Sequence, residues 1–243
     1  YTAYLESIGV RSGRRILGVR TIAADEDIAE ARRLRREADE SDEESDRALP
    51  PDFSKKQFAQ KINRSKNGLS ATEVGLAHHK FLEYVNLHQT NALAAEADRL
   101  TQQNYLTAEE SAALNLPALK HFWSSQLGQD IIAHAAEVRR ELPFTARFNA
   151  AEIEAITGKA AEPGLEEEFI LVQGVADLVV LRPNEIWLVD FKTDEISSRE
   201  LVDKIAVYKP QVLFYAAALE KIFGRKVTRK ALHFLAAKRT EEI

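Results

Sequence analysis

The stretch QGVADLVVLRPNEIWLVDFK, residues 173–192, decides the fold that we expect for this chain. It contains two apolar runs, Gly174–Leu181 and Ile186–Lys192, which are joined by the four residues RPNE at 182–185. Runs that are apolar on both faces are typical of strands buried inside a sheet. Because Pro-Asn is a turn signal, the stretch predicts a β-hairpin.

The register of this hairpin predicts two opposed carboxylates. A turn centred on Pro183-Asn184 pairs positions whose numbers sum to 367, so Asp177 faces Asp190 with Cβ atoms roughly 4.5–5.5 Å apart. Like charges on a buried sheet are costly, and a divalent cation held between them is the simplest compensation. Lys192 lies on the same face as Asp190, because it follows by two residues. The alternative is that both aspartates lie in water at strand ends and Lys192 neutralises one of them; the matched register and the apolar flanks favour the cation site.

Composition excludes several classes of protein. The chain has 243 residues, enough for one sizeable domain with or without an extension. It has no cysteine, which excludes disulfides, thiolate zinc sites and an iron–sulfur cluster bound by this chain. No run approaches the roughly 18 apolar residues of a membrane span, and no secretory signal is visible at the start. The net charge of −5 argues against strong binding to nucleic acid through bulk charge.

The first fifty residues differ in composition from the rest. Residues 1–23 are expected to be the tail of a preceding region, and 24–52 a charged linker that contains the acidic run Asp39–Asp46. A short exposed helix over 26–37 is compatible with the spacing of Glu and Arg. The main domain is expected over 53–243. Methionine is absent even at position 1, so we expect the chain to be part of a longer protein.

A helix is predicted to begin after Ser70, because Ser70 and Glu73 form a capping box. Its apolar face includes Phe81 and Leu82, and His78 and His79 fall on different sides of that face. A single helical histidine is more often a packing residue than a ligand. The residues alone do not choose between the two histidines.

The segment that follows is predicted to form short helices and then a strand. Helices are expected over Ala92–Gln103, from the capping box at Thr107, and after Pro117, and together they form a packing layer. Glu137–Phe148 is expected to be a strand interrupted at Pro143. Taken alone, Glu141 is only a solvated strand residue.

The C-terminal third is predicted to contain a long helix and a last strand. A short helix over Ala150–Thr157 ends at Gly158, and a loop follows over 159–168. After a polar connection over 193–207, Pro210 is expected to begin a helix that ends at Phe223, on which Gln211 and Tyr215 share a face. Lys226–Ala236 is expected to be the last strand. The basic residues beside it form the best local basic patch of the domain: Arg225, Arg229, Lys230, Lys238 and Arg239.

Five ordered motifs over residues 69–240 resemble the PD-(D/E)XK nuclease superfamily. They are GLAHH at 75–79, ELPF at 141–144, GVAD at 174–177, DFKT at 190–193 and QVLFY at 211–215. They are most similar to the RecB-like branch found at the C-terminus of AddA- and RecB-type helicase–nucleases, where the motifs read G-T-x-x-H, E-x-P-F, G-x-x-D, D-x-K-T and Q-x-x-x-Y. Leu76 stands where threonine is usual. The set of five is far more specific than any one motif.

The resemblance implies a fold and a set of roles. The fold is a restriction-endonuclease-like αβββαβ core, a mixed sheet flanked by helices, here with an added N-terminal helical layer. His79 rather than His78, Asp177, Asp190 and the backbone carbonyl of Phe191 would be metal ligands, a set that suits Mg²⁺ or Mn²⁺. Lys192 would act on the attacking water and on the charge that grows at phosphorus. Gln211 and Tyr215 would steady the site or the DNA backbone, and Glu141 would act one step removed from the metal.

The expected function is a metal-dependent DNA nuclease, the C-terminal exonuclease module of a bacterial helicase–nuclease that processes DNA ends in recombinational repair. Its expected partners are DNA and a linked UvrD/Rep-type helicase, in the cytoplasm near the nucleoid and with no membrane. One alternative is a catalytically silent DNA-binding or scaffolding module on the same fold, against which the intact Asp177, Asp190 and Lys192 set argues. Another is a freestanding restriction-type endonuclease, for which the first 60 residues are too short and too charged to form a sequence-reading domain.

Overall fold

A mixed β-sheet forms the centre of the computed structural model, which describes residues 16–18, 68–158, 169–194 and 199–243. The strands lie in the order β1-β3-β4-β5-β6, and β2 also pairs with β3. Pairing is parallel for β1–β3 and β4–β5 and antiparallel for the others. The strands are β1 (Ile16–Gly18), β2 (Val138–Asn149), β3 (Phe169–Leu181), β4 (Glu185–Lys192), β5 (Lys226–Phe234) and β6 (Arg239–Glu242).

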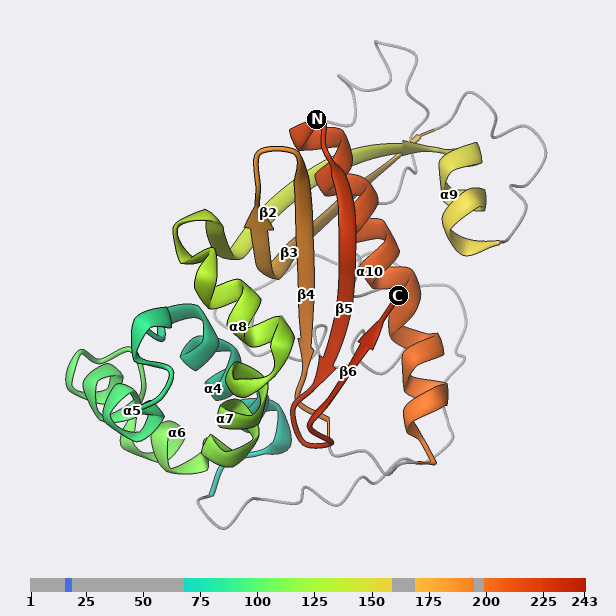
Figure 1. Cartoon of the computed structure of the whole chain (residues 1–243). Coiled ribbons are helices and arrows are strands. Elements are labelled where there is room, and N and C mark those ends of the chain that lie inside the picture. The colour runs from blue at the N-terminus through green and yellow to red at the C-terminus, as the bar shows by residue number, and fades with distance from the viewer. Residues whose placement is uncertain (1–15, 19–67, 159–168, 195–198) are drawn as a thin grey trace, which may run out of the picture.

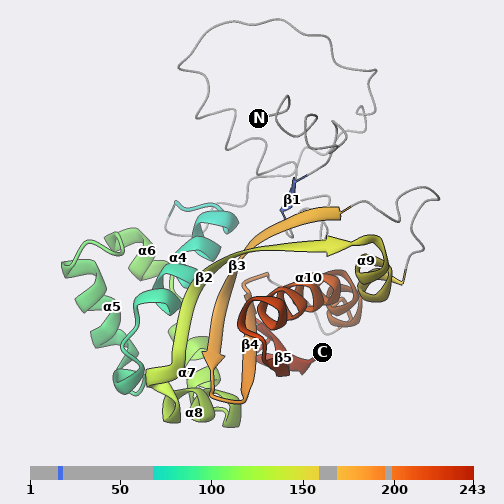
Figure 2. The same cartoon turned by 90° about the horizontal axis from the view of Figure 1, so that it is seen from above.

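Helices cover both faces of this sheet, α10 on one face and the group α4–α8 on the other (Figures 1 and 2). The helices are α4 (Ala71–Tyr84), α5 (Leu93–Gln102), α6 (Ala108–Ala113), α7 (Leu116–Ser124), α8 (Gln126–Ala133), α9 (Ala150–Thr157) and α10 (Leu201–Phe223), with 3-10 turns at Leu87–Gln89 and Ala135–Glu137. The order α4-β2-β3-β4-α10-β5 is the predicted αβββαβ core. The helices α5–α8 are the predicted extra layer. Among the described residues, no helix is both long and apolar enough to cross a membrane.

The central hairpin forms in the predicted register. Leu178 of β3 pairs with Val189 of β4, positions that sum to 367, and the ladder ends there, one position before Asp177 and Asp190. The N–H of Phe191 donates to Oδ2 of Asp177 over 2.7 Å. The two aspartates therefore lie where the strands of the hairpin separate.

Strands β2 and β3 change face at Glu141 and Asp177. Side chains alternate across a regular strand, so Ala176 and Leu178 should lie on the same face. Instead, Ala176 packs against α10 and Leu178 packs beneath the helices α4–α8, and the apolar residues of β2 on either side of Glu141 divide in the same way. The ladder omits the pair Glu141–Asp177, and Glu141 has a φ of 46°, in the left-handed region. Because Glu141 and Asp177 stand opposite each other, the pairing register of β2 and β3 is the same before and after them. The side chains of both strands nevertheless exchange faces of the sheet at this point.

Local signals in the sequence define most helix ends. Ser70 caps α4 as predicted: its Oγ accepts from the N–H of Glu73 (3.3 Å), and the Glu73 carboxylate accepts from the N–H of Ser70 (2.6 Å). Thr107 caps α6 in the same way, and α9 ends at Gly158 with a φ of 68°. The third expected helix is divided into α7 and α8, because Ser125 ends the first and caps the second.

The prediction that Pro143 interrupts a strand is wrong. β2 continues through Pro143, which pairs with Val175, and the irregular residue is Glu141. Within the described residues β2 pairs only with β3, so one of its edges carries no ladder. A residue without an N–H can be accommodated on such an edge strand.

The prediction that a helix begins at Pro210 is also wrong, because α10 begins at Leu201 and contains Pro210 in its interior. A proline there costs about 3 kcal/mol. Leu201 and Tyr208 precede the proline and are buried in the same core as Val212 and Tyr215, which follow it. Burial of each large side chain contributes about 1.5–3 kcal/mol, enough to offset the proline.

Five other predictions concern the chain ends or segments outside the described residues. The loop 159–168, the linker 24–52 and the helix over 26–37 lie outside the described residues. Of residues 1–23, only β1 is described; it pairs in parallel with residues 171–173 of β3 and is thus part of the main sheet. The last strand ends at Phe234 rather than Ala236, and the unpredicted strand β6 pairs with it.

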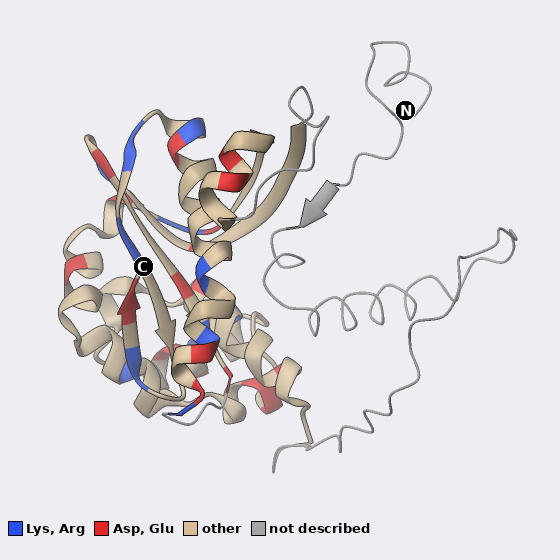
Figure 3. Ribbon diagram, turned by 90° about the vertical axis from the view of Figure 1, so that its right-hand side faces the viewer, with Lys and Arg blue, Asp and Glu red and all other residues tan. Residues whose placement is uncertain are grey.

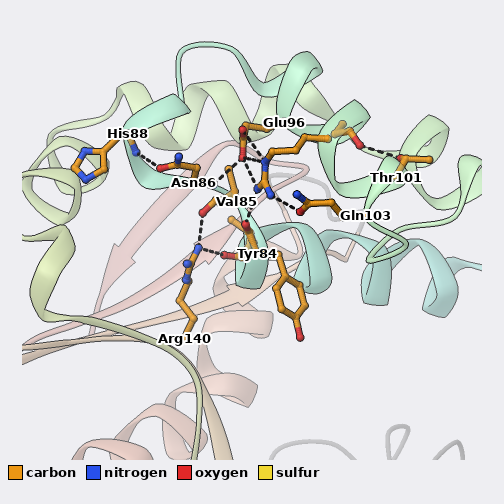
Figure 4. Close-up of polar contacts among 11 residues, drawn as sticks. Tyr84, Val85, Asn86, His88, Glu96, Thr101, Gln103 and Arg140 are labelled. Carbon is orange, nitrogen blue, oxygen red and sulfur yellow. Dashed lines mark hydrogen bonds and ion pairs between the residues drawn. The ribbon is translucent and has the colours of Figure 1, made fainter.

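Two arginines hold the C-terminal end of α4 (Figure 4). Arg99 of α5 donates to the carbonyl of Tyr84 (3.0 Å) and to the buried carboxylate of Glu96, which also accepts from the N–H of Asn86 (2.8 Å). Arg140 of β2 donates to the carbonyls of Leu82 and Val85. These carbonyls belong to the last turn of the helix and its cap, where carbonyls commonly lack a partner within the helix.

Replacing Glu96 by glutamine is expected to lower the free energy of unfolding at pH 7 by about 1.5–3 kcal/mol, the usual contribution of a hydrogen bond to a charged group. The hydrogen bonds from Arg99 hold the pKa of Glu96 below its ordinary value of 4.5; burial opposes them and the N–H of Asn86 adds to them. A depressed pKa stabilises the fold above the unfolded value and loses that contribution as the pH falls through the folded value.

Urea unfolding at pH 7 and at pH 3–4 measures this effect. The difference between wild type and Glu96→Gln should shrink as the pH falls below 4.5. An equal difference at both pH values would contradict the ion pair.

Candidate functional site

His79, Glu141 and Asp177 come together from three different elements, α4, β2 and β3. Nδ1 of His79 lies 3.6 Å from Oδ1 of Asp177 and 3.7 Å from Oε1 of Glu141. One ligand atom from each residue lies within 4.8 Å of the other two. The irregular residues of β2 and β3 are therefore the two that meet the histidine of α4.

The pKa of His79 reflects the negative charges of this cluster. Burial lowers the pKa of His79, but the negative charges of Asp177, Glu141 and Asp190 outweigh burial, and the net pKa is raised. The cluster thus favours a positive charge at this position, which a proton or a cation can supply.

His78 has a different environment. It is buried, its Nδ1 lies 2.7 Å from the carbonyl of Val74, and its Nε2 accepts from the N–H of Asn115 over 2.8 Å. Burial lowers the pKa of His78, the opposite direction to that of His79. Both ring nitrogens of His78 therefore have partners: Nδ1 contacts α4 itself, and Nε2 joins α4 to the start of α7.

Asp190 and Lys192 form the second half of the site, on β4. Asp190 is only 1% exposed, and Nζ of Lys192 lies 2.9 Å from its Oδ2 in an ion pair without the alignment of a hydrogen bond. Burial raises the pKa of Asp190, the charge of Asp177 raises it further, and Lys192 opposes both. A carboxylate that is buried and incompletely partnered is costly unless a cation joins it.

Lys192 is held by a chain of contacts from α10. Its ammonium donates to Oε1 of Gln211 over 2.9 Å, and Nε2 of Gln211 donates to the hydroxyl of Tyr215 over 3.0 Å. Gln211 and Tyr215 are 3% and 1% exposed, so their face is turned to the sheet rather than to solvent. The ring of Tyr215 packs edge-on against Phe144, with centroids 5.0 Å apart.

Gly174 permits this packing. A Cβ at Gly174 would lie 2.7 Å from Cζ of Phe144 and 3.1 Å from Cε1 of Tyr215, inside van der Waals contact with both rings. Gly174, Phe144 and Tyr215, which belong to three of the five motifs, therefore pack together next to Gln211.

Tyr208 lies beside Lys192 in the site; it begins the stretch YKPQVLFY at 208–215 that carries the resemblance, but it was assigned no role from the sequence. Nζ of Lys192 lies 4.2 Å from the centre of its ring, within the range of a cation–π contact, and its hydroxyl lies 2.5 Å from Oδ2 of Asp194. Tyr208 precedes Gln211 by three residues, a helical spacing that would have revealed it. The prediction that the helix begins at Pro210 concealed the spacing.

The basic patch beside β5 is partly neutralised. Arg229 pairs with Asp130 (2.7 Å) and Arg239 with Glu241 (2.9 Å), while Arg225 donates to the carbonyl of Arg182. Figure 3 shows basic and acidic residues interspersed over α10 and the neighbouring strands. This patch is therefore poorly suited to bind the phosphate backbone of DNA.

The donors present fit a divalent cation. His79, Glu141 and Asp177 offer one imidazole nitrogen and two carboxylate groups, and Asp190 adds a buried oxygen without a hydrogen-bond partner. Such a set of oxygen and nitrogen ligands is typical of divalent metal centres. The backbone of Phe191 lies beside these donors, because its N–H donates a hydrogen bond to Asp177. Glu141 contacts His79 directly, whereas the sequence placed it one step removed from the metal.

Residues 50–242 match the family model of the PD-(D/E)XK nuclease superfamily. An ATP-dependent helicase/nuclease subunit of Moorella thermoacetica is 37% identical over 175 residues, 71% of this chain and 12% of that protein. The proteins of the same name from Listeria welshimeri and Listeria monocytogenes are 30% and 31% identical over 210 residues, 83% of this chain and 16% of each protein. This chain thus spans about an eighth to a sixth of the length of these relatives.

Proposed function

Because the chain belongs to the PD-(D/E)XK nuclease superfamily, we propose that it hydrolyses phosphodiester bonds in DNA with Mg²⁺ or Mn²⁺. One observation carries this proposal: a buried Asp190–Lys192 pair lies next to a cluster of His79, Glu141 and Asp177 that attracts positive charge. A packing role does not account for two aspartates and a histidine gathered where two strands separate.

In this proposal, one group of residues holds the metal and another stabilises the negative charge of the transition state. His79, Asp177, Asp190 and the carbonyl of Phe191 would hold the metal, with Glu141 as a further carboxylate beside His79. When bound, the metal supplies Lewis-acid polarisation of the scissile phosphate. The ammonium of Lys192 donates a hydrogen bond to the attacking water or to the phosphate and stabilises the negative charge that grows in the transition state. Asp190, Gln211 and Tyr208 keep that ammonium in one place.

The similarity to proteins named as subunits of ATP-dependent helicase/nucleases supports a more specific proposal. This nuclease domain acts as an exonuclease on DNA strands that a linked helicase of the UvrD/Rep type delivers, during the repair of DNA ends by recombination in the bacterial cytoplasm. Delivery by a motor is compatible with the mild acidity of the chain and the partly neutralised patch beside β5, because the domain need not find DNA by its own charge.

Cleavage of end-labelled DNA by the 243-residue chain tests this function. We expect cutting of single-stranded DNA in Mg²⁺ or Mn²⁺ and none in EDTA, with calorimetry showing bound Mn²⁺. Products that shorten from one end identify an exonuclease, and internal fragments an endonuclease. A folded chain that neither cuts DNA nor binds Mn²⁺ would favour the silent DNA-binding module. Mn²⁺ binding without cutting would mean that cleavage depends on the rest of a longer protein.

Replacing His79 by alanine is expected to weaken Mn²⁺ affinity by at least about 10-fold, the lower end of the loss seen when even a residue beside a ligand is removed. His78→Ala is the matched control on the neighbouring residue. It should leave Mn²⁺ affinity unchanged and lower the free energy of unfolding by about 1–3 kcal/mol, because it removes a buried side chain and leaves the N–H of Asn115 without its partner. Calorimetry with Mn²⁺ and urea unfolding measure the two effects. The reverse result would place the site on the other side of α4.

A further inference from the structure

Arg140 and Glu141 are neighbours in β2, yet both side chains contact α4. Residues next to each other in a regular strand point to opposite faces of the sheet. Here Glu141 reaches His79, and Arg140 reaches the backbone at the end of the same helix. The left-handed φ of Glu141 permits this arrangement, because it interrupts the alternation of β2.

A left-handed backbone is unfavourable for a residue with a Cβ and persists only where neighbouring contacts fix it. On one side of Glu141, Leu142 pairs with Ala176 in the regular ladder. On the other side, Arg140 pairs with Leu178 in the same ladder, and its side chain is also tied to α4. The irregular residue therefore lies between two anchors.

The contact of Arg140 is specific in its geometry. Its Nη1 donates to the carbonyl of Val85 over 2.6 Å and to that of Leu82 over 3.2 Å (Figure 4). Both carbonyls are at the C-terminal end of α4, where a positive charge is favoured by the helix dipole. Leu82 follows His79 by three residues, so the contact lies within one turn of the histidine.

We propose that Arg140 is a positioning residue for the metal cluster, an inference that rests on the proposed metal-dependent function. The bond from Arg140 fixes the end of α4 on β2, and the contact of Glu141 with His79 is made from the next residue of the same strand. These two contacts together fix how α4 is rotated about its axis and where it lies along β2. His79 is thereby held within reach of Asp177 before any cation arrives, which lowers the cost of assembling the cluster.

Arg139 provides a matched control. It is the same residue type one position earlier and is exposed; its Nη1 donates to the carbonyls of Ala136 (3.2 Å) and Val138 (2.8 Å). Both carbonyls belong to residues next to Arg139 in the sequence, so these hydrogen bonds do not connect Arg139 to α4. The helix end should also survive the loss of Arg140, because Arg99 continues to bind the carbonyl of Tyr84.

The test compares Arg140→Met, Arg140→Lys and Arg139→Met in the 243-residue chain, at a temperature where each is fully folded. Methionine keeps much of the apolar stem and removes every donor, whereas lysine restores a charged donor. We expect Arg140→Met to weaken Mn²⁺ affinity by about 10-fold in calorimetry, as for other residues that orient ligands. We also expect it to lower kcat and to leave KM for DNA unchanged. Arg140→Lys should recover part of the loss, and Arg139→Met should match wild type.

A readout without metal separates this inference from the proposed function. Hydrogen exchange of the metal-free chain should show faster exchange in the second half of α4 in Arg140→Met alone. If the wild type bound no Mn²⁺, the proposed function would fail, whereas unchanged exchange and unchanged Mn²⁺ affinity in Arg140→Met would overturn the role of Arg140. A change confined to KM would overturn it as well, because it would make Arg140 a DNA contact.

Discussion

Replacing Lys192 by alanine is expected to lower kcat for DNA cleavage by about 10²–10³-fold, the loss typical when a preorganised donor to a developing oxyanion is removed. The structure gives Lys192 three partners and no role in the core: Oδ2 of Asp190, Oε1 of Gln211 and the ring of Tyr208. Affinity for Mn²⁺ should be unchanged or tighter, because the ammonium repels a cation that Asp190 attracts.

Single-turnover cleavage with saturating DNA and Mn²⁺ measures the effect on kcat. Lys204→Ala is the matched control, because Lys204 also lies over the ring of Tyr208 (5.8 Å) but pairs with Asp194 rather than Asp190. It should cut at close to the wild-type rate. A folded Lys192→Ala chain with wild-type kcat would remove Lys192 from the mechanism.

Replacing Asp190 by asparagine is expected to reduce Mn²⁺ affinity by at least about 100-fold and to abolish measurable cleavage, since a ligand should matter no less than the residues that orient ligands. The metal-free protein should remain folded. Burial raises the pKa of Asp190 above its ordinary value of 3.8, so its charge opposes folding at neutral pH rather than supporting it. The sign follows from linkage: a carboxyl with a raised folded pKa stabilises the fold while it is protonated, and this contribution declines as the pH rises from near 3.8 through the folded pKa.

Calorimetry with Mn²⁺ and thermal unfolding of the metal-free chain measure the two parts of this prediction. Asp130→Asn is the control, because it removes an aspartate that pairs with Arg229 away from the cluster. Unchanged Mn²⁺ affinity in Asp190→Asn would exclude Asp190 as a ligand and leave His79, Glu141 and Asp177 as the metal group.

The sequence was sufficient for the features that depend on short-range chemistry. The hairpin register followed from the turn at Pro183-Asn184, because turn position and strand pairing are linked by simple counting. The capping boxes at Ser70 and Thr107 and the stop at Gly158 followed from hydrogen bonds and φ preferences within four residues. The shared face of Gln211 and Tyr215 followed from helical spacing.

Where the sequence prediction failed, packing outweighed a local preference. Pro210 is a poor interior residue for a helix, but the burial of Leu201 and Tyr208 ahead of it extends α10 by nine residues. The helix brings Tyr208 over Lys192, a contact that the predicted helix start excluded. Pro143 looked like a strand break, yet an edge strand accommodates it.

The sequence by itself thus determined the order of the core elements α4-β2-β3-β4-α10-β5, the family and the residues that carry its motifs, but not the strands β1 and β6. Only the tertiary structure decided which of these residues touch. Taken alone, Glu141 looked like a solvated strand residue, and the resemblance placed it one step removed from the metal; its left-handed backbone brings it to His79 beside Asp177. Arg140 had no apparent role until its contact with the end of α4 was known. The physical reason is that local chemistry acts within a few residues, whereas these contacts join α4, β2 and β3 across 55 to about 100 positions of the chain.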